Sequence, residues 1–207
     1  MLESPNHIIK VVDYCDNPFI SIVTRHLKGR ENRLIKNIES LNEQTLKNFE
    51  QILIIDNVGL GLYEANKSFS LIKDMVRGRY VYGLDDDDFL CNNDFTKIIQ
   101  EESEKNNFPD VIVVRVNIVE KGLGKNHNID WDYILPKKWK SVPEINDSPG
   151  GSYIVKKEIY QKYISNFGAK RAGDFYFIDS IWKTNPSVIW IDKIMARAEV
   201  VSNGKIL

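Results

Sequence analysis

Cysteine is scarce in this sequence, with Cys15 and Cys91 as its two examples. They lie far apart and lack the close spacing of metal-binding cysteine motifs. Reduced thiols are the default for two such cysteines in a cytosolic protein. The cysteine content therefore favours free thiols over a disulfide, and a cytoplasmic location.

Net charge and long hydrophobic runs are also lacking. The 28 lysines and arginines nearly balance the 29 aspartates and glutamates, for a formal net charge of -1. Such a balance implies no general attraction to nucleic acid or to an anionic membrane. No stretch approaches the roughly 20 apolar residues that a membrane helix needs, and residues 1–6 lack the apolar core of a signal peptide. We expect no nucleic-acid partner and no integral membrane segment.

What the chain does contain is typical of a globular protein. Hydrophobic residues make up 43% of the 207 residues and charged residues 28%, which is ordinary for such a domain and enough to bury a real core. There is no internal repeat and no low-complexity tract. We predict a single domain over residues 1–207.

Strand-like and helix-like segments alternate through the first half of the chain. Short apolar runs predict buried strands, and apolar residues at helical spacing predict amphipathic helices between them, with Gly78 as a C-cap and residues 92–94 as an N-cap. The predicted strands cover residues 19–24, 51–55, 80–84 and 111–116, and the predicted helices lie around residues 34–41, 62–76 and 95–99. This alternation predicts an α/β fold with a mainly parallel sheet flanked by helices on both faces.

The second half has a different character. Residues 121–152 are rich in Gly, Asn, Pro and Lys and show little periodicity, which is typical of a binding loop or lid. Beyond them we predict strands at residues 152–155 and 188–191 and helices at residues 157–164 and 174–182. We interpret this half as the region that faces a partner or acceptor.

Four consecutive aspartates, Asp85 to Asp88, follow the predicted strand that ends at Leu84. Adjacent carboxylates repel one another, so a positive partner is needed to hold them in a folded site. A divalent metal with oxygen ligands is one such partner, and a solvated acidic loop is the alternative. The position favours the metal, because ligands of open α/β sheets bind at the carboxyl ends of strands.

Four motifs in order carry a resemblance to a known family. They are Ser21-Ile22-Val23, the run from Ser40 to Thr45, the run from Asn48 to Asn57, and the run from Gly78 to Asp88 with Gly61 and Ala65-Asn66 before it. In order and spacing these resemble the nucleotide-sugar glycosyltransferases of the GT-A fold, a Rossmann-like nucleotide-diphospho-sugar transferase fold, and in particular the large family 2. The resemblance covers residues 19–100 well and residues 150–182 weakly.

The chain departs from that family at two places. Arg25 and His26 stand where the family usually has a proline, and Val58-Gly59 stands where it usually has Gly-Ser. These departures leave the fold and the acidic motif in place, but they concern the contacts with the nucleobase. The resemblance implies a nucleotide-sugar donor, most simply a UDP-sugar, without fixing its identity.

The resemblance also implies roles for the acidic residues. It assigns Asp87 to a divalent cation, Mn²⁺ or Mg²⁺, and Asp85 to that cation or to the ribose. An extended segment would point Asp85 and Asp87 the same way. Asp86 and Asp88 are expected to support these two residues or to be structural, with Asp86 placed beside the substrate, and a shift of the motif by one residue stays open.

Further donor contacts are implied at the ends of the first two strands. Asp56 is expected to accept a hydrogen bond from the nucleobase, with a turn-forming Asp-Asn pair as the alternative. Thr24 and Arg25 follow the first strand and are expected to line the same pocket, where an arginine can pair with a phosphate. His26 is a phosphate or metal candidate by position alone.

A general base is implied at the start of a helix in the second half. The family usually has a Glu-Asp pair there, and the match in this chain is Gly173-Asp174. Asp174 is thus the expected base that takes the acceptor proton, while N-capping of the helix is the alternative role. Asp179 and then Asp147 are the other candidates.

The resemblance implies a metal-dependent, inverting glycosyltransferase that acts on a glycan or glycoconjugate acceptor. The donor and cation are expected in the half over residues 19–117 and the acceptor in the half over residues 118–207, where Trp131, Tyr133 and Trp139 are candidates for a sugar platform. The alternatives are a catalytically idle relative that still binds nucleotide sugar or glycan, and a nucleotidyltransferase. A nucleotidyltransferase needs a glycine-rich triphosphate loop after its first strand, and residues 24–33 hold one glycine.

Overall fold

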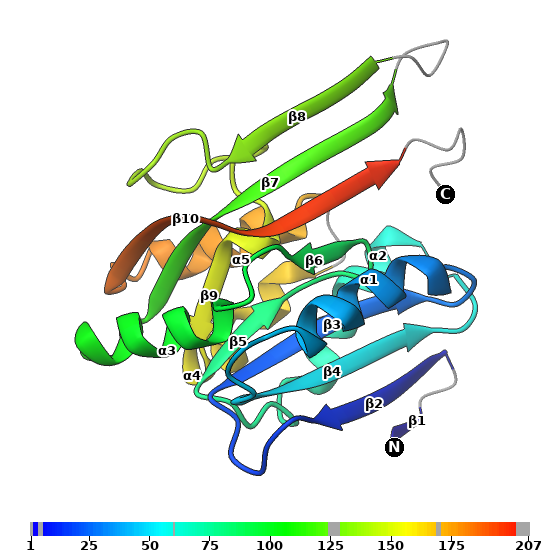
Figure 1. The fold of residues 1–207 in the computed structure, drawn as a ribbon, viewed down its shortest axis with the longest axis horizontal. Helices are drawn as coiled ribbons and strands as arrows, with labels where there is room; N and C mark the ends of the chain where they lie inside the picture. The colour runs from blue at the N-terminus through cyan, green and yellow to red at the C-terminus, as the bar shows by residue number, and fades with distance from the viewer. Residues whose placement is uncertain (1, 4–5, 60, 124–128, 169–170, 202–207) are drawn as a thin grey trace.

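A computed structural model describes residues 2–3, 6–59, 61–123, 129–168 and 171–201. Figure 1 shows one strongly twisted sheet with helices on both faces. The strands are β1 (Leu2–Glu3), β2 (His7–Asp13), β3 (Ile20–Leu27), β4 (Phe49–Asp56), β5 (Tyr80–Gly83), β6 (Asp88–Leu90), β7 (Val111–Leu123), β8 (Ile129–Leu135), β9 (Tyr153–Lys156) and β10 (Val188–Val201). The α-helices are α1 (Glu31–Asn42), α2 (Leu62–Ser68), α3 (Phe95–Lys105), α4 (Lys157–Tyr163) and α5 (Gly173–Trp182), and the 3-10 turns are η1 (Phe69–Ile72), η2 (Gly150–Ser152) and η3 (Ile164–Phe167).

The strand order is β1-β2-β4-β3-β5-β9-β7-β10-β6, with β8 paired to β7. Strand β3 runs parallel to both β4 and β5, and β10 runs parallel to β7. Because β9 is antiparallel to both β5 and β7, the long strands on its two sides keep one common direction. The prediction of an α/β fold with a mainly parallel sheet flanked by helices is confirmed in this sense, with shorter antiparallel strands inserted at the edges and the centre.

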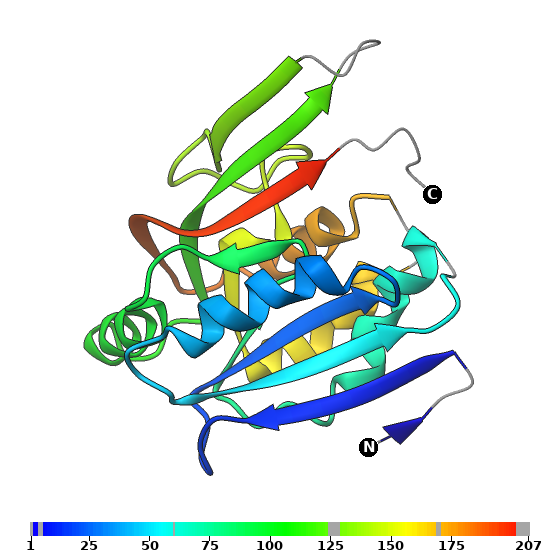
Figure 2. The same ribbon diagram turned by 45° about the vertical axis from the view of Figure 1, so that its right-hand side comes forward.

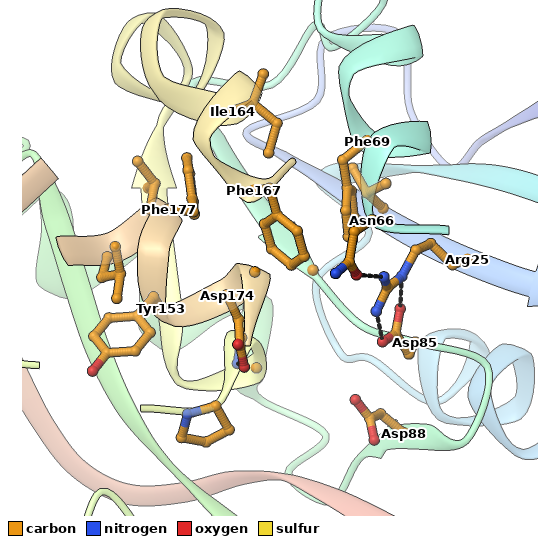
Figure 3. A pocket seen from close by; sticks show the side chains of 18 of the residues that line it. Arg25, Asn66, Phe69, Asp85, Asp88, Tyr153, Ile164, Phe167, Asp174 and Phe177 are labelled. Carbon is orange, nitrogen blue, oxygen red and sulfur yellow. Dashed lines mark hydrogen bonds and ion pairs between the residues drawn. The ribbon is translucent and has the colours of Figure 1, made fainter. Parts of the chain in front are cut away.

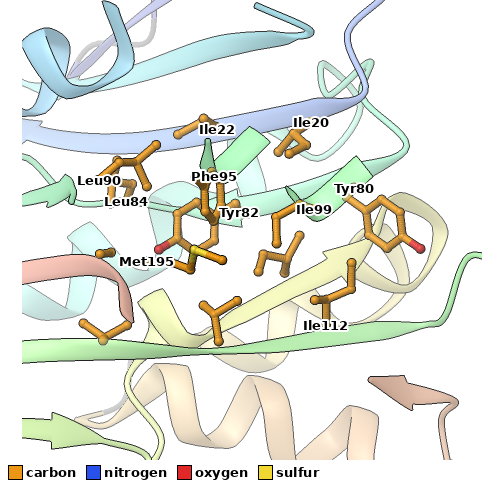
Figure 4. Packing of buried hydrophobic residues seen from close by; sticks show 14 of the residues in the cluster. Ile20, Ile22, Tyr80, Tyr82, Leu84, Leu90, Phe95, Ile99, Ile112 and Met195 are labelled. Atoms are coloured by element: carbon orange, nitrogen blue, oxygen red, sulfur yellow. The ribbon is translucent and has the colours of Figure 1, made fainter. Parts of the chain in front are cut away.

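Two hydrophobic clusters form the core, one on each face of the sheet. Ile20 and Ile22 of β3 point to the face covered by α1 and α3, where they pack with aromatic and aliphatic residues (Figure 4). Val23 points to the opposite face, which α4, α5 and η1 cover (Figure 2). Successive side chains of a strand alternate between faces, so the continuous apolar runs of β3, β4 and β5 are those expected of strands buried on both sides.

Four strands were not predicted from the sequence, the first being the two-residue β1, which pairs antiparallel with β2. Strand β2 pairs antiparallel with β4 and lies beyond it at the edge of the sheet, and β6 begins inside the acidic run itself. Strand β8 forms an antiparallel hairpin with β7, so the stretch over residues 121–152 is partly regular. Among the described helices, none is long and apolar enough to cross a membrane.

Gly78 is not a helix C-cap, contrary to the prediction. Helix α2 ends at Ser68, and η1 continues it only to Ile72. A Cβ atom on Gly78 would lie 2.4 Å from the backbone nitrogen of Ser21. Gly78 is therefore required because the chain passes directly against β3, and not because of a left-handed backbone conformation.

Candidate functional site

The acidic run forms a tight turn at the carboxyl end of β5. Strand β5 ends at Gly83, the backbone N–H of Asp88 donates to the carbonyl of Asp85 at 3.0 Å, and β6 begins at Asp88. The segment is therefore a turn, and the condition for Asp85 and Asp87 to point the same way, an extended segment, is not met. The turn brings Asp85 and Asp88 to the wall of one cavity (Figure 3), while Asp85 and Asp87 line a second one.

Asp86 is buried, and protein groups contact both of its carboxylate oxygens. Its side chain is 2% exposed, and its Oδ2 atom lies 2.9 Å from Nδ1 of His26 and accepts from the backbone N–H of Leu27 at 3.3 Å. Its Oδ1 atom forms an ion pair with Arg30 at 3.1 Å. Burial raises the pKa of Asp86 and the Arg30 charge opposes that rise. Both oxygens are held by protein groups, which gives Asp86 the structural role that was one of its two expected roles, and both Asp86 and His26 also line a cavity.

Asp87 and Asp88 differ sharply in their partners. Oδ2 of Asp87 accepts from Nη2 of Arg30 at 2.8 Å and from Nη1 of Arg33 at 3.1 Å. Among the described residues no side chain pairs with the carboxylate of Asp88, which has a hydrogen bond with the backbone of Asp85. Burial first, and then the charges of Asp85 and Asp87, raise the pKa of Asp88 well above its ordinary value.

Arg25 holds Asp85 with both ends of its guanidinium group. Its Nε atom donates to Oδ1 of Asp85 at 2.7 Å, its Nη2 atom pairs with Oδ2, and its Nη1 atom donates to Oδ1 of Asn66 at 2.8 Å. The guanidinium carbon also lies 4.6 Å from the ring centre of Phe69 and 5.7 Å from that of Phe167. Arginine thus supplies part of the positive charge that the acidic run requires.

A buried asparagine that the sequence analysis did not single out supports the turn. Asn37 of α1 is fully buried, and its Nδ2 atom donates to the carbonyls of Leu84, Asp85 and Asp88 at 3.3, 3.0 and 3.0 Å. Its Oδ1 atom accepts from Gln51 at 2.8 Å. The signal for this role was one polar residue on the apolar face of a predicted helix.

Replacement of Asn37 by alanine should therefore destabilise the protein and loosen the acidic turn. Loss of the amide removes one hydrogen-bond partner from each of these buried carbonyls and from the Gln51 amide, at a cost of about 1–3 kcal/mol in the free energy of unfolding. Asn42 at the exposed end of the same helix is the matched control, and Asn42→Ala should change stability by less than about 0.5 kcal/mol. Urea unfolding of both variants measures the difference, and equal midpoints would contradict this role for Asn37.

Two cavities lie at the carboxyl ends of β3, β4 and β5. The first, the Asp174 cavity, has a volume of about 280 Å³ and is lined by Asp85, Asp88 and Asp174 together with aromatic side chains that include Phe69 and Phe167. The second, the Asp56 cavity, has a volume of about 310 Å³, and Asp56 and Asp87 are among its lining residues. Arg25, Leu62 and Asp85 line both cavities, and so form the partition between them.

Asp174, the predicted general base, lines the Asp174 cavity. It follows Gly173 at the start of α5, and Figure 3 shows it across the cavity from Asp85. Its Oδ2 atom accepts from the backbone N–H of Gly150 at 3.2 Å and its Oδ1 atom from that of Phe175 at 2.9 Å. Burial raises the pKa of Asp174, while these hydrogen bonds and the Arg25 charge oppose the rise. The N-cap residue is Ala172 and not Asp174, although Asp174 accepts from the first-turn N–H of Phe175 and so supports the start of the helix.

Neighbouring atoms leave no room for a side chain at Gly173, the residue before Asp174. A Cβ atom on Gly173 would lie 2.4 Å from the carbonyl oxygen of Phe167 and 2.9 Å from Nδ2 of Asn66. Any side chain at this position would therefore collide with η3 and with the residue that holds Arg25. The glutamate expected from the resemblance cannot be accommodated in this backbone.

The other two base candidates lie outside both cavities. Asp179 faces away along α5 and pairs with Nζ of Lys183 at 2.6 Å. Asp147 accepts from the backbone N–H groups of Lys137 and Lys138 at 2.6 and 3.1 Å. These contacts make Asp179 a surface partner of lysine and Asp147 a loop-ordering residue.

Of the predicted donor contacts Asp56 and Thr24, Asp56 lines a cavity and Thr24 does not. Oδ1 of Asp56 accepts from the backbone N–H groups of Val58 and Gly59, both at 2.9 Å, so the turn-forming role is present, and the residue also lines the Asp56 cavity. Thr24 is fully buried and accepts from Gln51 at 3.0 Å. Side-chain alternation on β3 places Thr24 on the α1 face and Arg25 on the cavity face, so the prediction that Thr24 lines the pocket is wrong.

The aromatic residues of the second half do not form one platform. Trp139 packs against Trp190 with ring centres 5.0 Å apart and lies under the guanidinium group of Arg115. Trp131 and Tyr133 lie two residues apart on the same face of β8, where Trp131 is 55% exposed and both line a shallow hollow on the hairpin. Of the three predicted platform residues, these two lie together and Trp139 lies elsewhere.

Neither the family models nor the curated proteins contain a match to this chain. Solved structures of Staphylococcus aureus TarS, a glycosyltransferase of the GT-A type, do match this chain. TarS 1–349 without ligand matches at a TM-score of 0.61 and 15% identity. Its complex with UDP matches at 0.63 and 16%, and its complex with UDP-GlcNAc at 0.59 and 13%. The matches cover 87% of this chain and 58 to 60% of the TarS chains, so this chain spans about three fifths of their length. At this identity the likeness shows the fold, which is that of a GT-A-type glycosyltransferase.

Proposed function

We propose that this protein transfers a sugar from a nucleoside-diphosphate sugar, most simply a UDP-sugar, to a hydroxyl of a glycan or glycoconjugate. The observation that carries the proposal is the grouping of Asp85, Asp88 and Asp174 around one cavity, beside Arg25, at the carboxyl ends of parallel strands. Open α/β sheets bind ligands at this edge. The similarity of fold to TarS, which has been solved with UDP and with UDP-GlcNAc, supports the donor class.

The oxygen atoms of the acidic turn fit a divalent cation. Hard carboxylate oxygens suit Mg²⁺ or Mn²⁺, and Asp88 offers a carboxylate that pairs with no side chain among the described residues. No group of three or more His, Cys, Asp or Glu side chains among the described residues is arranged to hold a metal by itself. We therefore propose Asp85 and Asp88 as the main carboxylates for the cation, with Asp87 beside them, and the donor diphosphate as the source of further ligands.

The two cavities suggest how the donor lies. The nucleoside would occupy the Asp56 cavity and the transferred sugar the Asp174 cavity, with the diphosphate at the partition formed by Arg25 and Asp85. A bound cation supplies Lewis-acid stabilisation of the charge that develops on the departing diphosphate. The guanidinium group of Arg25 can share that charge through its paired N–H donors.

Asp174 is proposed as the general base of an inverting transfer. It would accept the proton of the acceptor hydroxyl while that oxygen bonds to the anomeric carbon and the diphosphate departs. The hydrogen bonds from Gly150 and Phe175 fix the orientation of its carboxylate. Trp131 and Tyr133 on the β7–β8 hairpin are proposed contacts for an extended acceptor.

Release of UDP from a UDP-sugar tests this proposal. Purified protein with UDP-GlcNAc and other UDP-sugars should release UDP in the presence of Mn²⁺, faster when oligosaccharides are added as acceptors, and EDTA should stop the release. The steric exclusion of glutamate at position 173 keeps a catalytically idle binder as the second candidate. Nucleotide binding without release of UDP under any of these conditions would favour that binder and contradict the transferase.

A further inference from the structure

Arg25 holds the partition between the two cavities closed in this structure. Its guanidinium group is engaged by both oxygens of Asp85, by Oδ1 of Asn66 and by the face of Phe69. The side chain of Arg25 is 20% exposed and that of Asp85 is 32% exposed, so this pair is in reach of a ligand in either cavity. A donor that spans the two cavities must pass this pair.

The same contacts set Arg25 and a divalent cation in competition. An arginine that pairs with both oxygens of a carboxylate neutralises it and occupies the in-plane positions that another cation would use. Asp85 cannot fully serve a cation while Arg25 holds it. The diphosphate of a donor is an equally good bidentate partner for the guanidinium fork.

We propose that Arg25 exchanges partners when the donor binds. In the free protein Arg25 neutralises Asp85 and suppresses binding of the cation, and in the donor complex it pairs with the diphosphate and releases Asp85 to the cation. This inference rests on the proposed function and adds a coupling to it, because nucleotide and cation then favour each other's binding by linkage. Asn66 is a positioning residue, since it holds the third edge of the guanidinium group.

The exchange predicts opposite effects of one substitution on two ligands. Arg25→Gln should bind Mn²⁺ alone about 10-fold more tightly than wild type, because Asp85 is released and a nearby positive charge is lost. The same variant should bind UDP in the presence of EDTA about 10-fold more weakly, because the phosphate partner is lost. Electron paramagnetic resonance of free Mn²⁺ measures the first affinity and calorimetry with UDP measures the second.

Three further variants make the test specific. Arg30→Gln removes an equal charge from the same turn but leaves Asp85 paired, so it should strengthen Mn²⁺ binding less than Arg25→Gln. Arg79→Gln is a distant control, because Arg79 stacks on Phe108 with its guanidinium carbon 3.9 Å from the ring centre, and it should change neither affinity. Asn66→Ala loosens Arg25 without a change of charge and should shift both affinities in the direction of Arg25→Gln.

The outcomes separate the exchange from the proposed function. If Arg25→Gln binds Mn²⁺ no more tightly than Arg30→Gln, or binds UDP as well as wild type does, the exchange is wrong while the donor site stands. If the wild-type protein binds no nucleoside diphosphate, with or without Mn²⁺, the proposed function itself is wrong. Circular dichroism confirms the fold of each variant, and Asn66→Ala decides the question if Arg25→Gln does not fold.

Discussion

Replacement of Asp174 by asparagine should lower the turnover number by a factor on the order of 10²–10⁴, which is the usual contribution of a positioned general base. Gly150 and Phe175 donate to different oxygens of Asp174, so an asparagine keeps an acceptor for one of these two backbone N–H groups. The variant has the same shape and should keep the fold of α5, and the affinity for the donor should stay within about a factor of two, since the proposed base acts on the acceptor and not on the donor. Steady-state transfer kinetics and calorimetry with the donor measure these two quantities separately.

The pH dependence of transfer should report the same residue. Burial raises the pKa of Asp174, and the hydrogen bonds from Phe175 and Gly150 and the charge of Arg25 oppose that rise, while Asp85 adds to it. A base must be deprotonated, so kcat/KM should fall as the pH drops through this raised pKa, at a pH above the ordinary value of about 3.9 for an aspartate. The fall should vanish from the residual activity of Asp174→Asn.

Asp179→Asn is the matched control on the same helix. Asp179 pairs with Lys183 and lines neither cavity, so its variant should keep wild-type turnover and the wild-type pH profile. A full rate in Asp174→Asn, or a comparable loss in Asp179→Asn, would move the base away from Asp174.

Replacement of Asp88 by asparagine should cause the second large loss. If Asp88 holds the cation, this variant should lower Mn²⁺-dependent kcat/KM by a factor on the order of 10²–10³, which corresponds to the several kcal/mol that a cation contributes to charge stabilisation. Asp87→Asn should lower it by less than about 10-fold, because Asp87 is already engaged by Arg30 and Arg33. Transfer rates over a range of Mn²⁺ concentrations measure both effects.

Asp88→Asn should raise the stability of the metal-free protein, although it lowers the transfer rate. The pKa of Asp88 is raised well above its ordinary value in the folded protein. The folded state therefore binds more protons than the unfolded state between the two pKa values, and stability falls as the pH rises through that range. At neutral pH Asp88→Asn should raise the unfolding temperature of the metal-free protein. A larger kinetic loss in Asp87→Asn than in Asp88→Asn would return the cation to Asp87, as the family resemblance implies.

The parallel strands could be predicted because their residues carry a strong local signal. Strands β3, β4, β5 and β7 are runs of aliphatic and aromatic residues buried on both faces, and such runs are distinctive in any sequence. Helix α5 could be predicted from its apolar residues, and the resemblance placed Asp174 at its start. Strand β6 could not be predicted, because it has three residues and the first of them, Asp88, belongs to the acidic run. The two apolar residues that remain are too few to form a strand pattern.

The partners of the acidic residues could not be predicted, because they come from distant parts of the chain. Arg25 and Asp85 are 60 residues apart in sequence, and no local pattern relates them. The exclusion of Thr24 was predictable in principle. Thr24 shares the alternation of Ile20 and Ile22, which face the core beneath α1, while Arg25 shares that of Val23.

Calorimetric titration of the wild-type protein with UDP and with UDP-GlcNAc, in Mn²⁺ and again in EDTA, tests the central claim most directly. The grouping of Arg25 with Asp85, Asp88 and Asp174 predicts saturable binding of one nucleotide per chain, tighter in Mn²⁺ and weakened by Arg25→Gln. Absence of binding by these ligands and by other nucleoside diphosphates, in every metal condition, would contradict the claim that the acidic turn is a donor site.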